Sequence, residues 1–272
     1  MKKLLMMVMT LCMLAFASVG FAAAGGTDIG NGDVTATGFG VMPPNAVNPA
    51  QARALGRRAA IADAYRQLAE MVQGVNVDAA TTVQNMMVVN DTINTKVQAM
   101  IKGARITSER AGADGAYEVT MSVPVFGVGG SLAEAVLPQN DKVEPFTGGS
   151  YADAREAAKH NVQVQGNYTG VIIDCSGLGL RTAMSPVIIS QNGQKVYGYK
   201  NLDSKTVISK GMAGYATSEA GAGRAGSNPL VLRALSIENG VNPVISQADV
   251  DKMLVENQST HFLDQCSVVF IR

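Results

Sequence analysis

The sequence contains no tryptophan, and aromatic residues make up only 5% of its 272 positions. It therefore lacks the aromatic clusters that often line sugar and base sites, and its core must be built mainly from aliphatic residues and methionine. An excess of charge of one sign is also missing, since 22 Lys and Arg balance 22 Asp and Glu. A chain this close to neutrality has no electrostatic footprint for nucleic acid, so we exclude nucleic-acid binding.

Residues that usually carry catalysis or hold metals are scarce. His160 and His261 are the only histidines, and neither has a second His or a Cys at metal-ligand spacing. A Ser or Cys nucleophile normally needs such a base, and the carboxylates are scattered rather than paired. We therefore expect no enzyme activity, no metal and no cofactor. A pocket that held either histidine beside a carboxylate would argue for an enzyme instead.

One glycine-rich run has the spacing of a dinucleotide-binding loop. Residues 221–226 read GAGRAG, but TSEA precedes them and SNP follows. A pyrophosphate loop needs a strand before it and a helix N terminus after it. Neither is predicted here, so we do not expect a nucleotide.

The N terminus has the order of a secretory signal. Lys2 and Lys3 precede an uncharged, largely apolar stretch over residues 4–24, and small residues flank a cut between Ala24 and Gly25. An uncleaved anchor is the alternative, because the stretch is just long enough to span a membrane. The small residues at the cut and the glycines after it favour cleavage. We therefore predict a signal peptide over residues 1–24 and an exported, soluble or peripheral mature protein.

The three cysteines fall into two groups. Cys12 lies in the apolar stretch after Leu11, where a lipoprotein signal needs a small residue, so we do not expect lipid attachment there. Cys175 and Cys266 remain after cleavage, and an even pair in an oxidising compartment could form a disulfide. Two separate buried thiols are the alternative, and the sequence favours neither.

The composition along the chain predicts an α+β protein of two small domains, each a mostly antiparallel sheet with one or two packed helices. The first domain, residues 30–137, has a strand at 33–41, a long helix and a hairpin around the turn at 111–115. Asn48 and Pro49 begin the helix, and Gly74 ends it. Its apolar stripe is expected to contain Ala54, Ile61, Tyr65, Leu68 and Val72.

Residues 138–160 are predicted to be a linker that includes a short helix, and residues 161–272 a second α+β domain. In this second domain Ser246 is predicted to cap a helix, and the runs at 171–173 and 266–271 to be strands.

Two further features allow a functional and a structural interpretation. Four arginines of the long helix could form a basic stripe for lipid headgroups, namely Arg53, Arg57, Arg58 and Arg66. Because Asp63 and Glu70 lie among them, a solvated face with local ion pairs is the better interpretation. Gly38 and Gly40 could mark the approach of a ligand, but a bulge or turn at a strand end is more common.

The first domain resembles a known family in several short stretches. These are ATGFG at 36–40, RRAA at 57–60, DAY at 63–65, IKGA at 101–104 and YEV at 117–119. They are similar to the Lpp-twenty type outer-membrane lipoproteins, and the module also resembles those of flagellar proteins P and T. The resemblance covers about residues 33–125. It implies a structural or assembly role, such as a ring or disk at the outer membrane, and it brings no catalytic motif. The lipoprotein cysteine of that family is missing here, and the second domain is not covered.

From these observations we expect a non-catalytic structural protein of the cell envelope. It would be exported to the periplasm, associate peripherally with the outer membrane and contact copies of itself or other envelope proteins, in an oligomer of flagellar-ring type. The alternative function is that of a periplasmic protein that binds a small ligand in a pocket between its domains.

Overall fold

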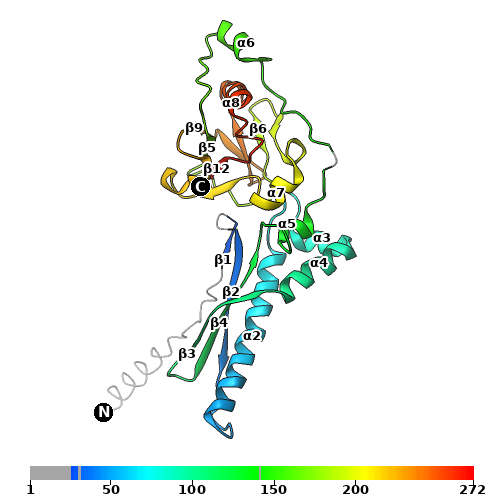
Figure 1. Cartoon of the computed structure of the whole chain (residues 1–272), viewed down its shortest axis with the longest axis vertical. Helices are drawn as coiled ribbons and strands as arrows, with labels where there is room; N and C mark the ends of the chain where they lie inside the picture. The colour runs from blue at the N-terminus through cyan, green and yellow to red at the C-terminus, as the bar shows by residue number, and fades with distance from the viewer. Residues whose placement is uncertain (1–25, 30–31, 141) are drawn as a thin grey trace, which may run out of the picture.

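The computed structural model describes residues 26–29, 32–140 and 142–272, so the predicted cleavage site and Cys12 lie outside the described residues. Figure 1 shows an elongated part below a more rounded part. We call the described residues of 26–137 the arm and residues 142–272 the head. The α+β class is confirmed in both.

The arm is an antiparallel sheet with one long helix on it. Its strands follow the order β1-β2-β4-β3, and each neighbouring pair is antiparallel. They are β1 (Gly26–Asp28), β2 (Asp33–Val41), β3 (Arg105–Ala111) and β4 (Ala116–Pro124). Helix α2 (Pro49–Gln73) runs along β2 and β4 (Figure 1). The antiparallel sheet with a packed helix that was predicted for this domain is thus confirmed.

Helix α2 begins where the sequence predicts. The side chain of Asn48 accepts a hydrogen bond from the backbone N–H of Gln51 at 2.8 Å, and Pro49 occupies the first helical position. The predicted apolar stripe is wrong in part, because Ala54 is exposed and Ile61 and Tyr65 are only partly buried. The buried side of the helix consists of Gly56, Ala60, Ala64, Leu68 and Val72.

The reason for this shift is a very close approach of α2 to β2. A Cβ atom added to Gly38 would lie 2.1 Å from the backbone nitrogen of Ala64, and one added to Gly40 would lie 2.1 Å from the carbonyl oxygen of Gly56. Only small residues fit between the two elements, so the larger side chains of the helix turn away from the sheet. Gly38 and Gly40 therefore lie inside a regular strand, and the predicted bulge or turn is wrong.

Three shorter helices lie at the end of the arm nearest the head (Figure 1). They are α3 (Val83–Val89), α4 (Asp91–Lys102) and α5 (Leu132–Val136). Asn90 caps α4 by accepting from the N–H groups of Thr92 and Ile93, and Ser131 caps α5. These caps fix short helices whose own length gives them little stability.

The head contains two sheets, and the prediction that its strands are mostly antiparallel is wrong. One sheet has the order β8-β12-β5-β9 and is parallel throughout. Its strands are β5 (Gly170–Asp174), β8 (Gly214–Ala216), β9 (Pro229–Arg233) and β12 (Val268–Ile271). The central strands β5 and β12 are continuous aliphatic runs buried on both faces, which is typical of parallel sheets.

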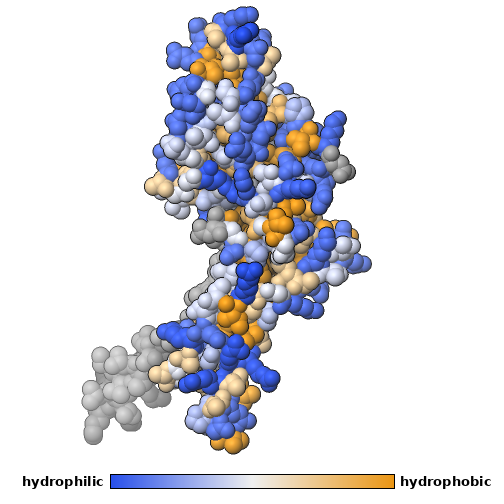
Figure 2. Space-filling view, viewed as in Figure 1, coloured by the Kyte–Doolittle hydropathy of each residue, from blue (hydrophilic) through white to orange (hydrophobic). Residues whose placement is uncertain are grey.

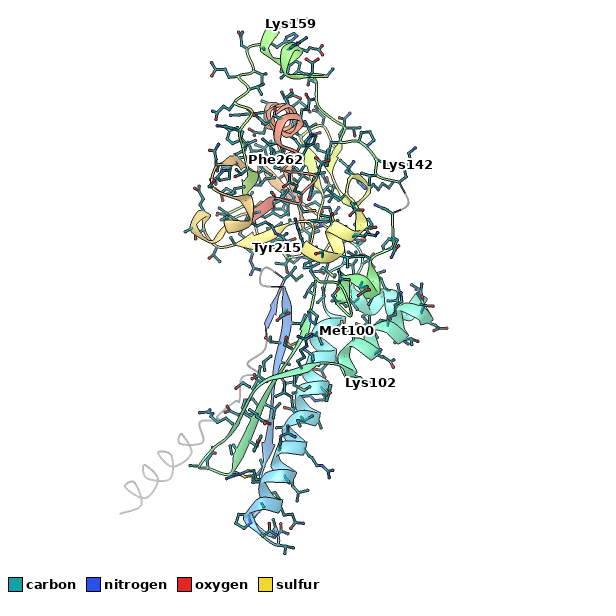
Figure 3. The ribbon with its side chains drawn as sticks, in the orientation of Figure 1. Met100, Lys102, Lys142, Lys159, Tyr215 and Phe262 are labelled. Atoms are coloured by element: carbon teal, nitrogen blue, oxygen red, sulfur yellow. The ribbon has the colours of Figure 1, made fainter. Side chains whose placement is uncertain are left out.

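The second sheet of the head is mixed, with the order β10-β11-β6-β7 and one parallel pair, β11 with β6. Its strands are β6 (Ile188–Ser190), β7 (Lys195–Tyr197), β10 (Ser236–Glu238) and β11 (Asn242–Ile245). The helices of the head are α6 (Ala154–Lys159), α7 (Ser204–Lys210) and α8 (Gln247–Thr260), with 3-10 turns at Tyr199–Asn201, Glu219–Gly221 and Gly223–Ala225. Ser246 caps α8 as predicted. Figure 3 shows side chains packed around Tyr215 and Phe262 inside the head.

The segment predicted as a linker, residues 138–160, and the residues that follow it are held against α8 of the head. The buried carboxylate of Glu256 on α8 accepts hydrogen bonds from the backbone N–H groups of Gln165 and Gly166, both at 2.6 Å. Asp251, also buried on α8, accepts from the N–H of Ser150 at 2.7 Å. Asp251 accepts a further hydrogen bond from Gln247 at 3.0 Å. Because buried polar groups need hydrogen-bond partners, these contacts fix the segment on α8.

The arm and the head are joined by a packed junction. The N–H groups of Met184 and Ser185 donate to the carbonyl oxygens of Asn76 and Val77, at 3.0 and 2.7 Å. One cluster of buried apolar side chains also continues from the arm into the head. The junction still leaves an open cavity of about 450 Å³, lined by Asp33 from the arm and by Lys210 and Arg224 from the head.

Candidate functional site

The outer edge of β3 is an open edge of the sheet in the arm. β3 ends the sheet, and β4 is its only strand partner among the described residues. All seven residues of β3 are exposed, whereas the other long strands bury alternate residues. An edge of this kind presents backbone N–H and C=O groups with which a strand of another chain can pair.

A β-bulge interrupts β3 near its start. The pairing register shifts between Ile106 and Ser108, so Thr107 is the extra residue, and its hydroxyl donates to the carbonyl oxygen of Thr120 at 3.3 Å. A bulge increases the local twist and often occurs at sheet edges. It limits the length of straight edge that a partner could use to the residues after Thr107.

The charges on β3 are mostly neutralised within the arm. Arg57 on α2 binds Glu109 at 2.7 Å, and Arg110 binds Glu118 of β4 at 2.9 Å. The hydrogen bond to Glu109 raises the pKa of Arg57 above its usual value. Arg105 forms no ion pair with the residues that the structure describes. Charged side chains commonly protect a sheet edge from pairing with another chain. Because ion pairs within the arm neutralise Glu109 and Arg110, that protection is weaker at β3.

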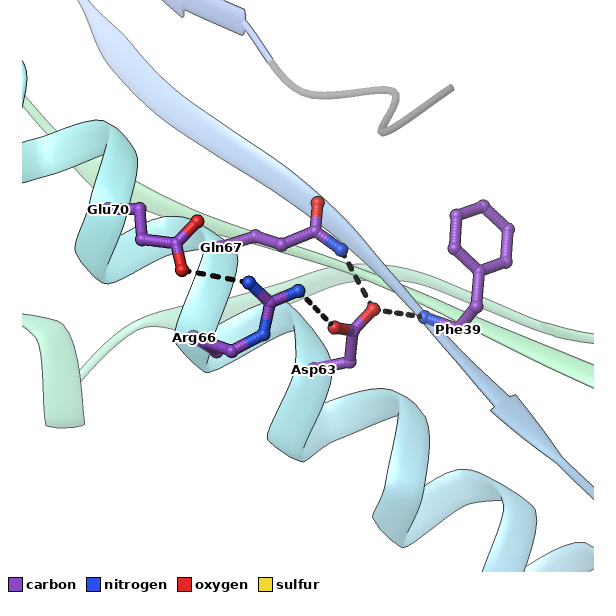
Figure 4. A network of polar contacts seen from close by, with 5 residues as sticks. All are labelled: Phe39, Asp63, Arg66, Gln67 and Glu70. Carbon is purple, nitrogen blue, oxygen red and sulfur yellow. Dashed lines mark hydrogen bonds and ion pairs between the residues drawn. The ribbon is translucent and has the colours of Figure 1, made fainter. Parts of the chain in front are cut away.

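The opposite edge of the sheet is capped by a side chain from α2 (Figure 4). β1 pairs only with the first residues of β2, and further along the N–H of Phe39 donates to Asp63 at 3.0 Å. Asp63 also accepts from Gln67 and Arg66, and Arg66 in turn binds Glu70 at 2.8 Å. Burial alone would raise the pKa of Asp63, but these hydrogen bonds outweigh it and lower the pKa. The two edges therefore differ, since Asp63 occupies a donor of one, whereas β3 has no such side-chain acceptor on its outer backbone among the described residues. The predicted local ion pairs on this helix are confirmed at Arg66.

The end of the arm where α2 begins exposes large aliphatic side chains. Val41 is 76% exposed and Val47 is 87% exposed, and Leu55 lies nearby on the first turns of α2. Figure 2 shows apolar surface at this end of the molecule. Exposed apolar groups gathered at one end of a molecule are candidates for contact with another protein.

The two histidines lie in the head. The ring of His160 stacks on Tyr151 with centroids 5.0 Å apart. His261 and Asp264 line a cavity of about 590 Å³, and Nδ1 of His261 lies 3.6 Å from a carboxylate oxygen of Asp264. This is the juxtaposition that would argue for an enzyme. The two side chains are 66% and 49% exposed, and the same oxygen of Asp264 accepts a hydrogen bond from Asn257 at 3.0 Å.

The structure does not bring Cys175 and Cys266 together. Both are buried free thiols. Cys175 follows the end of β5 and Cys266 precedes the start of β12, and these strands run parallel with Val171 beside Val268. The cysteines therefore lie at opposite ends of the strand pair, roughly 20 Å apart at about 3.3 Å per residue, which is too far for a disulfide. Burial raises the pKa of the Cys175 thiol to about 12.

The glycine-rich run at 221–226 forms parts of two 3-10 turns that lead into β9. Strand β9, and not a helix, comes directly after it, so the run does not lead into the helix N terminus that would bind a pyrophosphate.

Two features of the arm were not predicted. One is the run of small residues Gly56, Ala60 and Ala64, whose spacing of four places them on one side of a helix. The other is the contact of Asp63 with the edge of β2. The first had a signal in the sequence, because small residues four apart on a helix beside glycines two apart on a strand indicate close packing.

Comparison with known proteins gives two matches, one in each half of the chain. Residues 40–123 match the model of the LPP20 lipoprotein family, which confirms the predicted resemblance of the first domain. Residues 170–272 match the model of the second domain of Treponema pallidum Tp0624. None of the curated proteins matches the chain. Within the described residues, no helix combines the length and the apolar character needed to cross a membrane. The matches support an exported protein of the cell envelope.

Proposed function

We propose that this chain is a non-catalytic structural or assembly protein of the cell envelope, which associates with copies of itself through the outer edge of β3. The single observation that carries the proposal is that edge, exposed along all seven residues and unpaired among the described strands. The match to the LPP20 lipoprotein family supports the envelope location. We further propose that the protein acts in the periplasm, at the outer membrane.

The difference between the two sheet edges favours one arrangement of copies. Asp63 occupies the N–H of Phe39 at the β2 edge, so β3 of one copy is expected to pair with β3 of another rather than with β2. Pairing of the same element on both copies closes a two-fold dimer. A larger ring of flagellar type therefore needs a second contact, for which the exposed Val41 and Val47 at the end of the arm are the candidates.

The experiment compares the solution mass of residues 25–272 with that of two variants at Glu109, in the straight part of the edge after the bulge. Gly112 donates its N–H to Ala116 across the hairpin, so the alternation of an antiparallel ladder turns the N–H of Glu109 away from β4. A proline there removes no bond to β4, yet it removes an outer donor and its ring keeps a neighbouring strand away. Glu109→Pro is expected to be monomeric at concentrations at which the unmodified protein is dimeric or larger. Glu109→Ala is the matched control, because it loses the same ion pair with Arg57 but keeps the N–H, and it should assemble normally. If Glu109→Pro assembles as the unmodified protein does, β3 is not the contact.

A further inference from the structure

A groove lies between α4 and the segment that carries α5, mostly in the arm, and Ile208 of the head lines one end of it. It consists of two adjoining cavities of about 540 and 400 Å³, which share Lys96, Glu134 and Ala135. Each has a volume within the range of small-molecule sites. The floor of the larger cavity includes the buried side chains of Met100 and Val123.

Two cations line the larger cavity without an ion-pair partner. Lys96 comes from α4 and Arg105 from the start of β3, and neither forms an ion pair with the residues that the structure describes. The one carboxylate nearby, Glu134, accepts hydrogen bonds from the N–H groups of Gly130 and Gly129 at 2.7 and 2.9 Å. These bonds, with a smaller effect of Lys96, lower the pKa of Glu134. Even with Glu134 ionised, two cations against one carboxylate leave the lining of the groove with a formal net charge of +1.

We propose that this groove binds a small amphipathic anion, which consists of an apolar body and a single carboxylate or phosphate. The anionic group lies between Lys96 and Arg105, where charge-assisted hydrogen bonds to both are available. The apolar body lies on the floor formed by Met100, Val123 and Ala135, where it is removed from water. The site is separate from the cavity between arm and head and from the edge of β3 after the bulge.

The test measures the binding of four probes to residues 25–272 by titration calorimetry, below the concentration at which the probes form micelles. Dodecanoate and dodecyl phosphate carry both parts of the predicted ligand, dodecanol lacks the charge and acetate lacks the apolar body. Dodecanoate or dodecyl phosphate is expected to bind with at least about tenfold higher affinity than dodecanol or acetate. Whichever of dodecanoate and dodecyl phosphate binds more tightly identifies the anionic group. Equal affinity for dodecanol, or no binding of either anion, would overturn the proposal.

Variants then locate the site. Lys96→Ala combined with Arg105→Ala is expected to weaken dodecanoate binding by about tenfold or more, and Ala99→Trp, at the exposed rim of the groove, should block it. Lys102→Ala is the matched control, because Lys102 is an exposed cation on the same helix that does not line the groove (Figure 3). All variants lie at exposed positions, so their unfolding midpoints without ligand should stay close to that of the unmodified protein. Unchanged binding in the double variant would place the ligand elsewhere. The Glu109→Pro variant should bind normally, because Glu109 does not line the groove, which separates this result from assembly.

Discussion

The arm and the head are packed in different ways. In the arm, α2 lies closely against β2 through glycine and alanine, and the large side chains that are fully buried, such as Leu68 and Met121, are not aromatic. In the head, the aromatic side chains of Phe262, Phe270 and Tyr197 are fully buried around two sheets. A single helix on a single sheet can come very close where the residues between them are small, whereas two sheets with helices enclose bulkier groups. The difference teaches that the arm depends on the small residues between α2 and β2 and the head on large buried side chains.

The largest effect should come from filling the narrow space in the arm. In Gly38→Ala, the new Cβ would meet the backbone of Ala64 at 2.1 Å, so α2 must move away from the sheet. We expect a loss of about 3 kcal/mol in the free energy of unfolding, measured with denaturant. Gly223→Ala in the head is the control, since its Cβ would meet nothing within 4 Å. Equal stability of the two variants would show that the arm is not closely packed.

A smaller loss is expected from a buried carboxylate of the head. Glu256→Ala leaves the N–H groups of Gln165 and Gly166 without their acceptor, at a cost of about 2 kcal/mol. Amide hydrogen exchange at these two residues should speed up, while exchange in α2 of the arm stays unchanged. Faster exchange throughout both parts would mean that arm and head unfold as one unit.

The stability of the folded state should depend on pH through Asp63, which caps one edge of the sheet in the arm. Because the pKa of Asp63 is lowered from its ordinary value of 3.8, its ionised form stabilises the folded state. This contribution is fully present above pH 3.8 and is lost as the pH falls through the lower pKa of the folded state. Asp63→Asn should cost about 1 kcal/mol at neutral pH, and the difference from the unmodified protein should shrink in acid. A difference that does not vary with pH would contradict the lowered pKa.

The smallest effect is expected at the ion pair on the surface of the arm. Arg57 and Glu109 are both more than one-third exposed, so solvent screens their attraction. A double-mutant cycle with Arg57→Ala and Glu109→Ala should show no resolvable coupling in the unfolding midpoint. A clear coupling would mean that this pair, and not only glycine packing, holds α2 to the sheet.

The sequence predicted the features of the fold that depend on local signals. The cap at Asn48, the hairpin of β3 and β4 and the cap at Ser246 follow from turn and cap residues, and all are present. The buried side of α2 was not predicted, because apolar size was taken as the guide where close packing selects glycine and alanine. The parallel pairing of β5 with β12 was missed because it joins segments far apart in the chain.

The candidate site was less accessible to sequence reasoning. Which edge of a sheet stays open depends on the strand order, and the capping of β2 by Asp63 depends on the angle at which α2 crosses it. The groove beside Lys96 and Arg105 likewise joins residues of α4, β4 and the segment before α5. The pattern of residues along one helix or strand carries no direct signal for a site that is built from several elements.

Amide hydrogen exchange of β3 as a function of protein concentration tests the central claim most directly. If copies pair through this edge, exchange in Arg105–Ala111 should slow as the concentration and the measured mass rise together, because the outer amides gain partners. Exchange in β5 of the head should stay the same. A mass that stays monomeric, or a rising mass with unchanged exchange in β3, would contradict the account.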